Sequence, residues 1–112
     1  GMITKDDILL ILSNSGETIE LQPIINYAAR FAIPIIALVR RKQSILVTAA
    51  AIAIILPDIA EASPIDAPTT STTMMLAIGD ALAIALMRQK SFKSNDFARF
   101  HPGGSKSPGQ MK

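Results

Sequence analysis

The strongest indication of the fold is the run Ile8-Leu9-Leu10-Ile11-Leu12, followed at once by Ser13-Asn14-Ser15-Gly16-Glu17-Thr18. A short continuous apolar run bounded by polar residues predicts a strand buried on both faces, as in a parallel sheet. The segment from Thr18 to Phe31 has apolar residues at helical spacing, although Pro23 indicates that the regular helix begins nearer Leu21. The pattern is therefore a buried strand, a turn of small polar residues and a helix.

The turn between strand and helix has the composition of a phosphate-binding loop. Backbone N–H groups at a helix N-terminus lack intrahelical partners and, with the helix dipole, favour an anion. Ser13 and Ser15 add hydroxyl groups, and Gly16 allows a ligand to approach the backbone closely. A plain strand-to-helix turn is the alternative interpretation of these residues. The composition favours binding of a small phosphorylated molecule.

Strand and helix patterns continue to alternate along the chain. We expect strands at 35–39 and 52–56, a short helix from Ser44 to Ala50, an irregular segment at 57–68, and a long helix after Pro68. Gly79, within that long helix, indicates close packing, because glycine there costs about 1 kcal/mol relative to alanine. Residues 94–100 favour one further helical turn, and 105–112 are expected to form a flexible tail.

This alternation predicts an α/β fold with three layers, in which a parallel sheet is flanked by helices and joined by right-handed crossovers. Three strands are few for such a sheet, and at least one edge would lie open. We therefore expect either an incomplete domain or association, as a homo-oligomer, through the open edge or the helices.

Composition limits the classes of function. The 112 residues suit one small domain, and the absence of cysteine, with a single histidine, argues against a disulfide framework, a metal site or a bound cofactor. Six basic residues from Arg88 onward oppose Asp96 alone, but aromatic residues are too few for a nucleic-acid stacking platform. The apolar run 45–56 is too short to cross a bilayer. We expect a cytoplasmic protein without nucleic-acid or membrane partners.

Five motifs together resemble the sugar isomerase (SIS) domain family, and within it the arabinose-5-phosphate isomerases. The motifs are residues 7–17, Glu20 on the helix that follows, Glu61-Ala62-Ser63-Pro64 in place of Glu-Ala-Cys-Pro, Ala67-Pro68-Thr69-Thr70-Ser71-Thr72-Thr73 with Gly79-Asp80-Ala81-Leu82-Ala83, and Asp96-Phe97-Ala98 with His101-Pro102-Gly103-Gly104. They cover nearly all of residues 6–104, so residues 1–104 are expected to form a partial SIS domain.

The resemblance implies a function and a set of site residues. The family reaction interconverts D-ribulose 5-phosphate and D-arabinose 5-phosphate through an enediol, in the context of lipopolysaccharide biosynthesis, and it needs a base, an enediolate-stabilising group and a phosphate anchor. By resemblance, Glu20, Glu61 and His101 are catalytic, with His101 reaching a neighbouring subunit's site. The implied substrate-binding residues are Ser13, Asn14, Ser15, Gly16, Thr18, Thr69, Thr70, Ser71 and Thr72.

The chain also departs from the family pattern. The family domain begins with a Gly-rich strand and loop that carry a lysine, and we find no counterpart of this segment among the 112 residues. The turn after the second strand is Val39-Arg40-Arg41-Lys42, where the family usually has a Thr-Gly-Arg type turn. We therefore expect the later half of a domain, with impaired isomerase activity. Two alternatives stay open: a non-catalytic sugar-phosphate-binding remnant and a self-associating interaction module.

Overall fold

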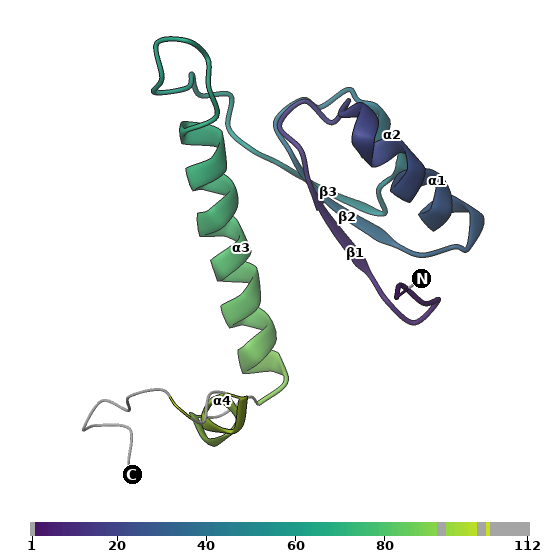
Figure 1. Cartoon of the computed structure of the whole chain (residues 1–112), viewed down its shortest axis with the longest axis vertical. Helices are drawn as coiled ribbons and strands as arrows, with labels where there is room; N and C mark the ends of the chain where they lie inside the picture. The colour runs from purple at the N-terminus through teal and green to yellow at the C-terminus, as the bar shows by residue number, and fades with distance from the viewer. Residues whose placement is uncertain (1, 92–93, 101–102, 104–112) are drawn as a thin grey trace. The chain divides into compact units, whose positions relative to one another are not determined.

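The computed structural model describes residues 2–91, 94–100 and 103. Its elements, labelled in Figure 1 where space allows, are β1 (Leu9–Leu12), η1 (Ile19–Leu21), α1 (Gln22–Arg30), β2 (Ile35–Val39), α2 (Ile45–Ala49), β3 (Ile52–Ile55), α3 (Thr70–Gln89) and α4 (Ser94–Phe100). The chain forms two units, 1–75 and 76–112, which are described separately.

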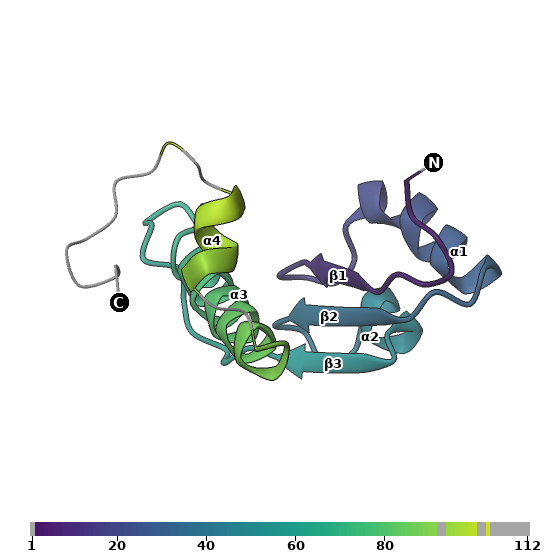
Figure 2. The ribbon, with the colours of Figure 1, turned by 90° about the horizontal axis from the view of Figure 1, so that it is seen from below.

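The first unit contains one parallel sheet flanked by helices, as the sequence predicts. The strand order is β1-β2-β3, and the three arrowheads point the same way in Figure 2. The register pairs Ile11 with Ala37, and Ala37 with Ala53. All three strands therefore end at one edge of the sheet, from which the loops after β1, β2 and β3 leave.

The core of this unit lies between one face of the sheet and the helices α1 and α2 (Figure 1). Its buried members come from β1, β2, the two helices and the segment just before β2. They are Ile11, Ile25, Ala28, Ile33, Ile35, Ala37, Val39 and Leu46. Side chains alternate between the faces of a strand, so residues two apart share this core. The strands β1 and β2 form one side of this core, and the helices α1 and α2 form the other side.

The opposite face of the sheet is less covered than the sequence predicts. Leu10 and Leu12 of β1 are 46% and 44% exposed, and Ile52 of β3 is 57% exposed. Burial on both faces is therefore wrong for the outer strands, because α1 and α2 both pack on the other face. The prediction holds for the central strand, in which only Ile36 is more than slightly exposed.

Local sequence signals set the ends of the first helices. The regular part of α1 begins at Gln22, after the 3-10 turn η1, with Pro23 in its first turn, as predicted. Ser44 caps α2, because its Oγ accepts a hydrogen bond of 3.3 Å from the Val47 N–H. The predicted short helix is confirmed at Ile45–Ala49.

The long helix α3 has free space at Gly79 within its own unit. A Cβ atom built on Gly79 meets no described atom within 4 Å, so the predicted close packing is not found there. Among the described residues α3 is also the one helix whose length and mean hydropathy, 1.5, would suit a membrane crossing, although core helices of soluble proteins share these properties. The short helix predicted at 94–100 is confirmed as α4, and the tail 105–112 lies outside the described residues.

Candidate phosphate-binding site

The loop at residues 13–18, here called the serine loop, begins at the carboxyl end of β1. The Ser13 N–H donates a hydrogen bond of 3.0 Å to the Leu38 carbonyl, so the loop leaves the sheet only after this last contact with β2. Ser13 is 6% exposed. Open parallel α/β sheets hold ligands beside the carboxyl ends of their strands, and the serine loop occupies such a position.

Two hydroxyl groups close the serine loop on itself. Ser13 Oγ accepts a hydrogen bond of 3.0 Å from the Gly16 N–H and lies 2.9 Å from Thr18 Oγ1. Ser15 Oγ accepts a third bond, of 3.1 Å, from the Glu17 N–H. In the Ser13–Thr18 pair one hydroxyl donates and the other accepts, so the accepting group keeps a hydrogen that this bond does not use. The pair can donate that hydrogen to an anion.

Gly16 is required by the shape of the serine loop. Its φ of +69° is in the left-handed region, which glycine adopts without the steric cost that a side chain brings. A Cβ atom here would also lie 2.7 Å from Ser44 Cβ and 3.0 Å from Val39 Cγ2, and would overlap Ser44 Oγ. The loop therefore packs directly on the N-cap of α2.

The serine loop also caps the backbone of α2. The Leu46 N–H donates a bond of 3.1 Å to the Gly16 carbonyl, and the Ile45 N–H donates one of 2.9 Å to Glu17 Oε1. A carboxylate at a helix N-terminus is favoured by the dipole. Sequence reasoning missed this role of Glu17, since its partner lies 28 residues further along the chain.

The side chain of Asn14 has a buried acceptor without a partner in the described part of the chain. Its backbone carbonyl accepts bonds from the N–H groups of Arg40 and Arg41, at 3.2 and 3.4 Å. Its side-chain Oδ1 is buried and has no hydrogen-bond partner among the described residues. An unsatisfied buried acceptor costs about 1–3 kcal/mol, which a donor such as a sugar hydroxyl would recover.

A second cluster joins Glu61 to the start of α3. Glu61 Oε2 accepts bonds from the N–H and the hydroxyl of Thr69, and Oε1 accepts one of 3.3 Å from the Ser71 N–H. The hydroxyls of Thr69 and Thr70 in turn each accept a bond of 3.0 Å from the Ala62 N–H. Four residues that the sequence predicts for the site are therefore in one network.

This network keeps Glu61 ionised. Hydrogen bonds from the Ser71 hydroxyl and the Thr69 N–H, the two largest causes, lower the pKa of the Glu61 carboxyl from 4.5 to about 2. A carboxylate that accepts several backbone and hydroxyl bonds holds its charge, and a negative charge also suits the N-terminus of α3. In this arrangement Glu61 is a weak base, and it orients the segment from Thr69 to Ser71.

The other predicted site residues have different positions. Glu20 is exposed in η1, directly after the serine loop. The Thr72 hydroxyl donates a bond of 2.9 Å to the Thr69 carbonyl. His101 lies outside the described residues, so its role stays a prediction, as do the catalytic roles of Glu20 and Glu61. Within 2–91, 94–100 and 103, no three His, Cys, Asp or Glu residues gather as a metal site would require.

A parallel α/β sheet that carries a polar, glycine-containing loop at its carboxyl edge defines a class of small-ligand-binding domain. The SIS domain model matches residues 1–85, and the chain belongs to this family. The match extends into α3, so most of that helix is part of the domain by sequence.

Two arabinose 5-phosphate isomerases align with most of this chain. It is 48% identical over 106 residues to arabinose 5-phosphate isomerase KpsF of Escherichia coli, and 45% identical to arabinose 5-phosphate isomerase KdsD of Pseudomonas aeruginosa. Each alignment covers 94% of this chain, but only 33% and 32% of the relative. The chain thus spans about a third of the length of these curated relatives.

Solved structures have the same fold. An Escherichia coli CFT073 protein in complex with arabinose 5-phosphate superposes with a TM-score of 0.84 at 34% identity, over 90% of this chain and 54% of that one. A Bacteroides fragilis protein described as a phosphosugar isomerase involved in capsule formation gives 0.85 at 29% identity, over 92% and 55%. The predicted SIS-type fold is therefore confirmed.

Proposed function

We propose that the serine loop binds the phosphate group of a pentose 5-phosphate, and that the chain thereby contributes to interconversion of D-ribulose 5-phosphate and D-arabinose 5-phosphate. The observation that carries the proposal is the closure of the loop by Ser13 and Thr18 around Gly16 at the carboxyl edge of the sheet. The named relatives and the neighbour solved with arabinose 5-phosphate support the choice of ligand.

The reaction moves a proton between adjacent carbons of the sugar through an enediol, and the predicted site residues suit separate parts of it. The serine loop would hold the phosphate, and Asn14 Oδ1 would accept a bond from a sugar hydroxyl. Glu20, exposed beside the loop, would take the proton from carbon, while His101 would return a proton to the enediolate. Catalysis by Glu61 would require release of the bonds from Thr69 and Ser71, so we assign it a positioning role.

Binding is tested first. Isothermal titration of the chain with arabinose 5-phosphate should show saturable binding, and uncharged arabinose should bind at least tenfold more weakly. Ser13→Ala removes one hydroxyl of the Ser13–Thr18 pair, whose spare hydrogen would be donated to the phosphate, and should weaken binding about tenfold, because a hydrogen bond to a charged group contributes about 1.5–3 kcal/mol. Thr4→Ala, which removes an exposed hydroxyl before β1, is the matched control. The absence of binding by any pentose phosphate at millimolar concentration would refute the proposal.

Turnover is tested separately. We expect conversion of ribulose 5-phosphate in a coupled assay at high protein concentration, and loss of conversion in Glu20→Gln with binding changed less than twofold. Binding without conversion would favour the second candidate, a non-catalytic sugar-phosphate-binding domain. The observation behind that candidate is the occupied, ionised carboxylate of Glu61.

We also propose that the chain self-associates through the sheet edges or the less covered sheet face. Leu10, Leu12 and Ile52 leave substantial apolar surface on that face, and both outer strands have an unpaired edge in the described sheet. Light scattering at micromolar concentration should give a dimer or a larger assembly. A monomer under these conditions would exclude self-association.

A further inference from the structure

Three consecutive cations follow β2 and form what we call the basic turn, Arg40–Lys42. Arg40 is half-buried, and Arg41 and Lys42 are exposed. The turn lies at the carboxyl end of the central strand, beside the serine loop in the sheet order. Its position is therefore at the ligand-binding edge expected for a parallel sheet.

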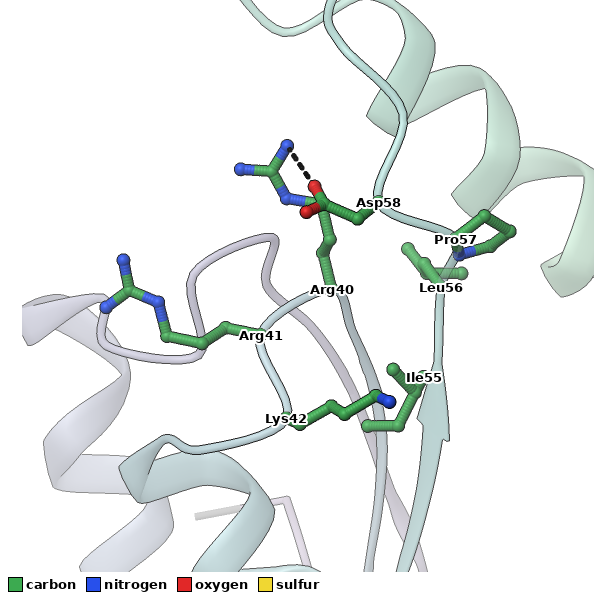
Figure 3. Close-up of a pocket in the computed structure, with 7 residues that line it drawn as sticks. All are labelled: Arg40, Arg41, Lys42, Ile55, Leu56, Pro57 and Asp58. Atoms are coloured by element: carbon green, nitrogen blue, oxygen red, sulfur yellow. Dashed lines mark ion pairs between the residues drawn. The ribbon is translucent and has the colours of Figure 1, made fainter.

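The basic turn lines a depression with Ile55, the last residue of β3, and with residues 56–58 that follow it (Figure 3). The volume of about 710 Å³ is within the range of small-molecule sites, about 300–1,000 Å³. Figure 3 shows Lys42 extending beside Ile55, whereas Arg41 is directed away from the β3 segment. Arg40 Nη1 forms an ion pair of 3.3 Å with Asp58 Oδ1. With one carboxylate against three cations, the lining has an excess of two positive charges.

The ion pair leaves two of the cations for other partners. Arg40 is paired with Asp58, whose side chain is 88% exposed, so solvent screens this ion pair and its contribution to stability is small. Arg41 and Lys42 have no ion-pair partner among the described residues. Two exposed cations on consecutive residues produce a positive potential that attracts small anions.

Backbone hydrogen bonds join the basic turn to the serine loop. The N–H groups of Arg40 and Arg41 both donate to the Asn14 carbonyl. The serine loop itself contains no cation, and the carboxylate of Glu17 is its one charge. A phosphate monoester carries a charge of nearly −2 at pH 7, and a loop of hydroxyl and N–H groups neutralises little of it. The basic turn is the nearby segment that carries positive charge and is bonded to the serine loop.

We propose that the basic turn, through Arg41 and Lys42, is a recognition element for a phosphate monoester dianion. The inference rests on the proposed function only for the identity of the sugar that carries the phosphate. The charge argument is independent of the proposed function. The phosphate is either the group held by the serine loop or a second group bound in the depression. In both cases the ligand group is a phosphate, and the number of phosphates bound per chain distinguishes the two cases.

The experiment compares charge variants by titration with arabinose 5-phosphate and with inorganic phosphate, at low and high ionic strength. Arg41→Gln with Lys42→Gln should weaken both ligands roughly five- to tenfold at low salt and by less at high salt, where exposed charges are screened. Asp58→Asn should act in the opposite direction and strengthen binding about twofold, because it removes a repelling charge and releases Arg40. Lys5→Gln, an exposed lysine before β1, is the matched control and should change neither ligand.

The outcomes separate this inference from the proposed function. Weaker binding in the double variant supports the basic turn. In that case one phosphate per chain, lost also in Ser13→Ala, identifies a shared site, whereas two phosphates, one of which survives Ser13→Ala, identify a separate site. Unchanged binding in the double variant, with binding lost in Ser13→Ala, would overturn the inference and leave the function standing. If the double variant no longer binds inorganic phosphate, but the parent chain binds arabinose 5-phosphate no more tightly than inorganic phosphate, the inference stands and the proposed function fails. Equal loss in Lys5→Gln would show that only net charge matters and would overturn the inference.

Discussion

Gly16→Ala should strongly destabilise the first unit, because two independent costs fall on the added methyl group. The left-handed backbone at φ +69° costs a residue with a Cβ about 1–2 kcal/mol. The methyl carbon would also lie 2.7 Å from Ser44 Cβ, and such overpacking typically costs about 1–3 kcal/mol. The two costs together give an expected loss of about 2–5 kcal/mol in the free energy of unfolding.

The two costs of Gly16→Ala can be separated with a double-mutant cycle. Ser44→Gly removes the Cβ and Oγ that the new methyl would meet, while glycine as an N-cap costs only a few tenths of a kcal/mol. In that background Gly16→Ala should keep the backbone part, about 1–2 kcal/mol, and the tight contact with Val39 Cγ2, but lose the overlap with Ser44. The coupling between the two positions then measures the overlap.

Gly79→Ala is the matched control. A Cβ at that position meets no atom within 4 Å, so alanine should gain its helix propensity, about 0.5–1 kcal/mol. Urea denaturation of all variants, followed by circular dichroism, measures each change. If Gly16→Ala proved as stable as the parent chain, or if its cost were the same with Ser44→Gly, the described packing of the serine loop on α2 would be refuted.

Three further outcomes follow from the same contacts. Ser44→Ala should lower the free energy of unfolding by about 1 kcal/mol, because the Val47 N–H loses its acceptor, whereas exposed Gln43→Ala should change it little; equal effects would contradict the cap. Glu61 has a folded-state pKa of about 2 against an ordinary 4.5, so its contribution to stability is present above about pH 4.5 and is lost as the pH falls toward 2. The difference in Tm between the parent chain and Glu61→Gln should therefore shrink over that interval, and a constant difference would argue against the network. Thr69→Val removes a hydroxyl that donates to Glu61 and should raise the pKa of that carboxyl, measurable by NMR titration.

Much of the fold could be predicted because its signals are local. The strand at 35–39 matches β2 at both ends, Pro23 marks the start of α1 within a residue or two, and Ser44 caps α2 as expected. Apolar runs, proline geometry and capping depend on neighbours within one turn or one strand, and these are visible in the order of residues.

The errors and omissions concern contacts between distant segments. The exposure of Leu10 and Leu12 depends on which face α1 and α2 cover, and the free space at Gly79 depends on what packs there. The sequence predicts a catalytic role for Glu61 by resemblance and gives Glu17 no partner, although both carboxylates accept bonds from backbone N–H groups at the start of a helix. These contacts join residues far apart in the sequence, and no repeating pattern of residues predicts them.

Three features follow from the order of residues alone: the alternation of strands and helices, the serine- and glycine-containing loop after the first strand, and the family resemblance. Three others required the folded chain: the need for glycine at position 16, the ionisation of Glu61 by its partners at the start of α3, and the bonds between the basic turn and the serine loop. The physical reason is that strand and helix formation depends mainly on short-range sterics, whereas charge state and close packing depend on atoms that only folding brings together.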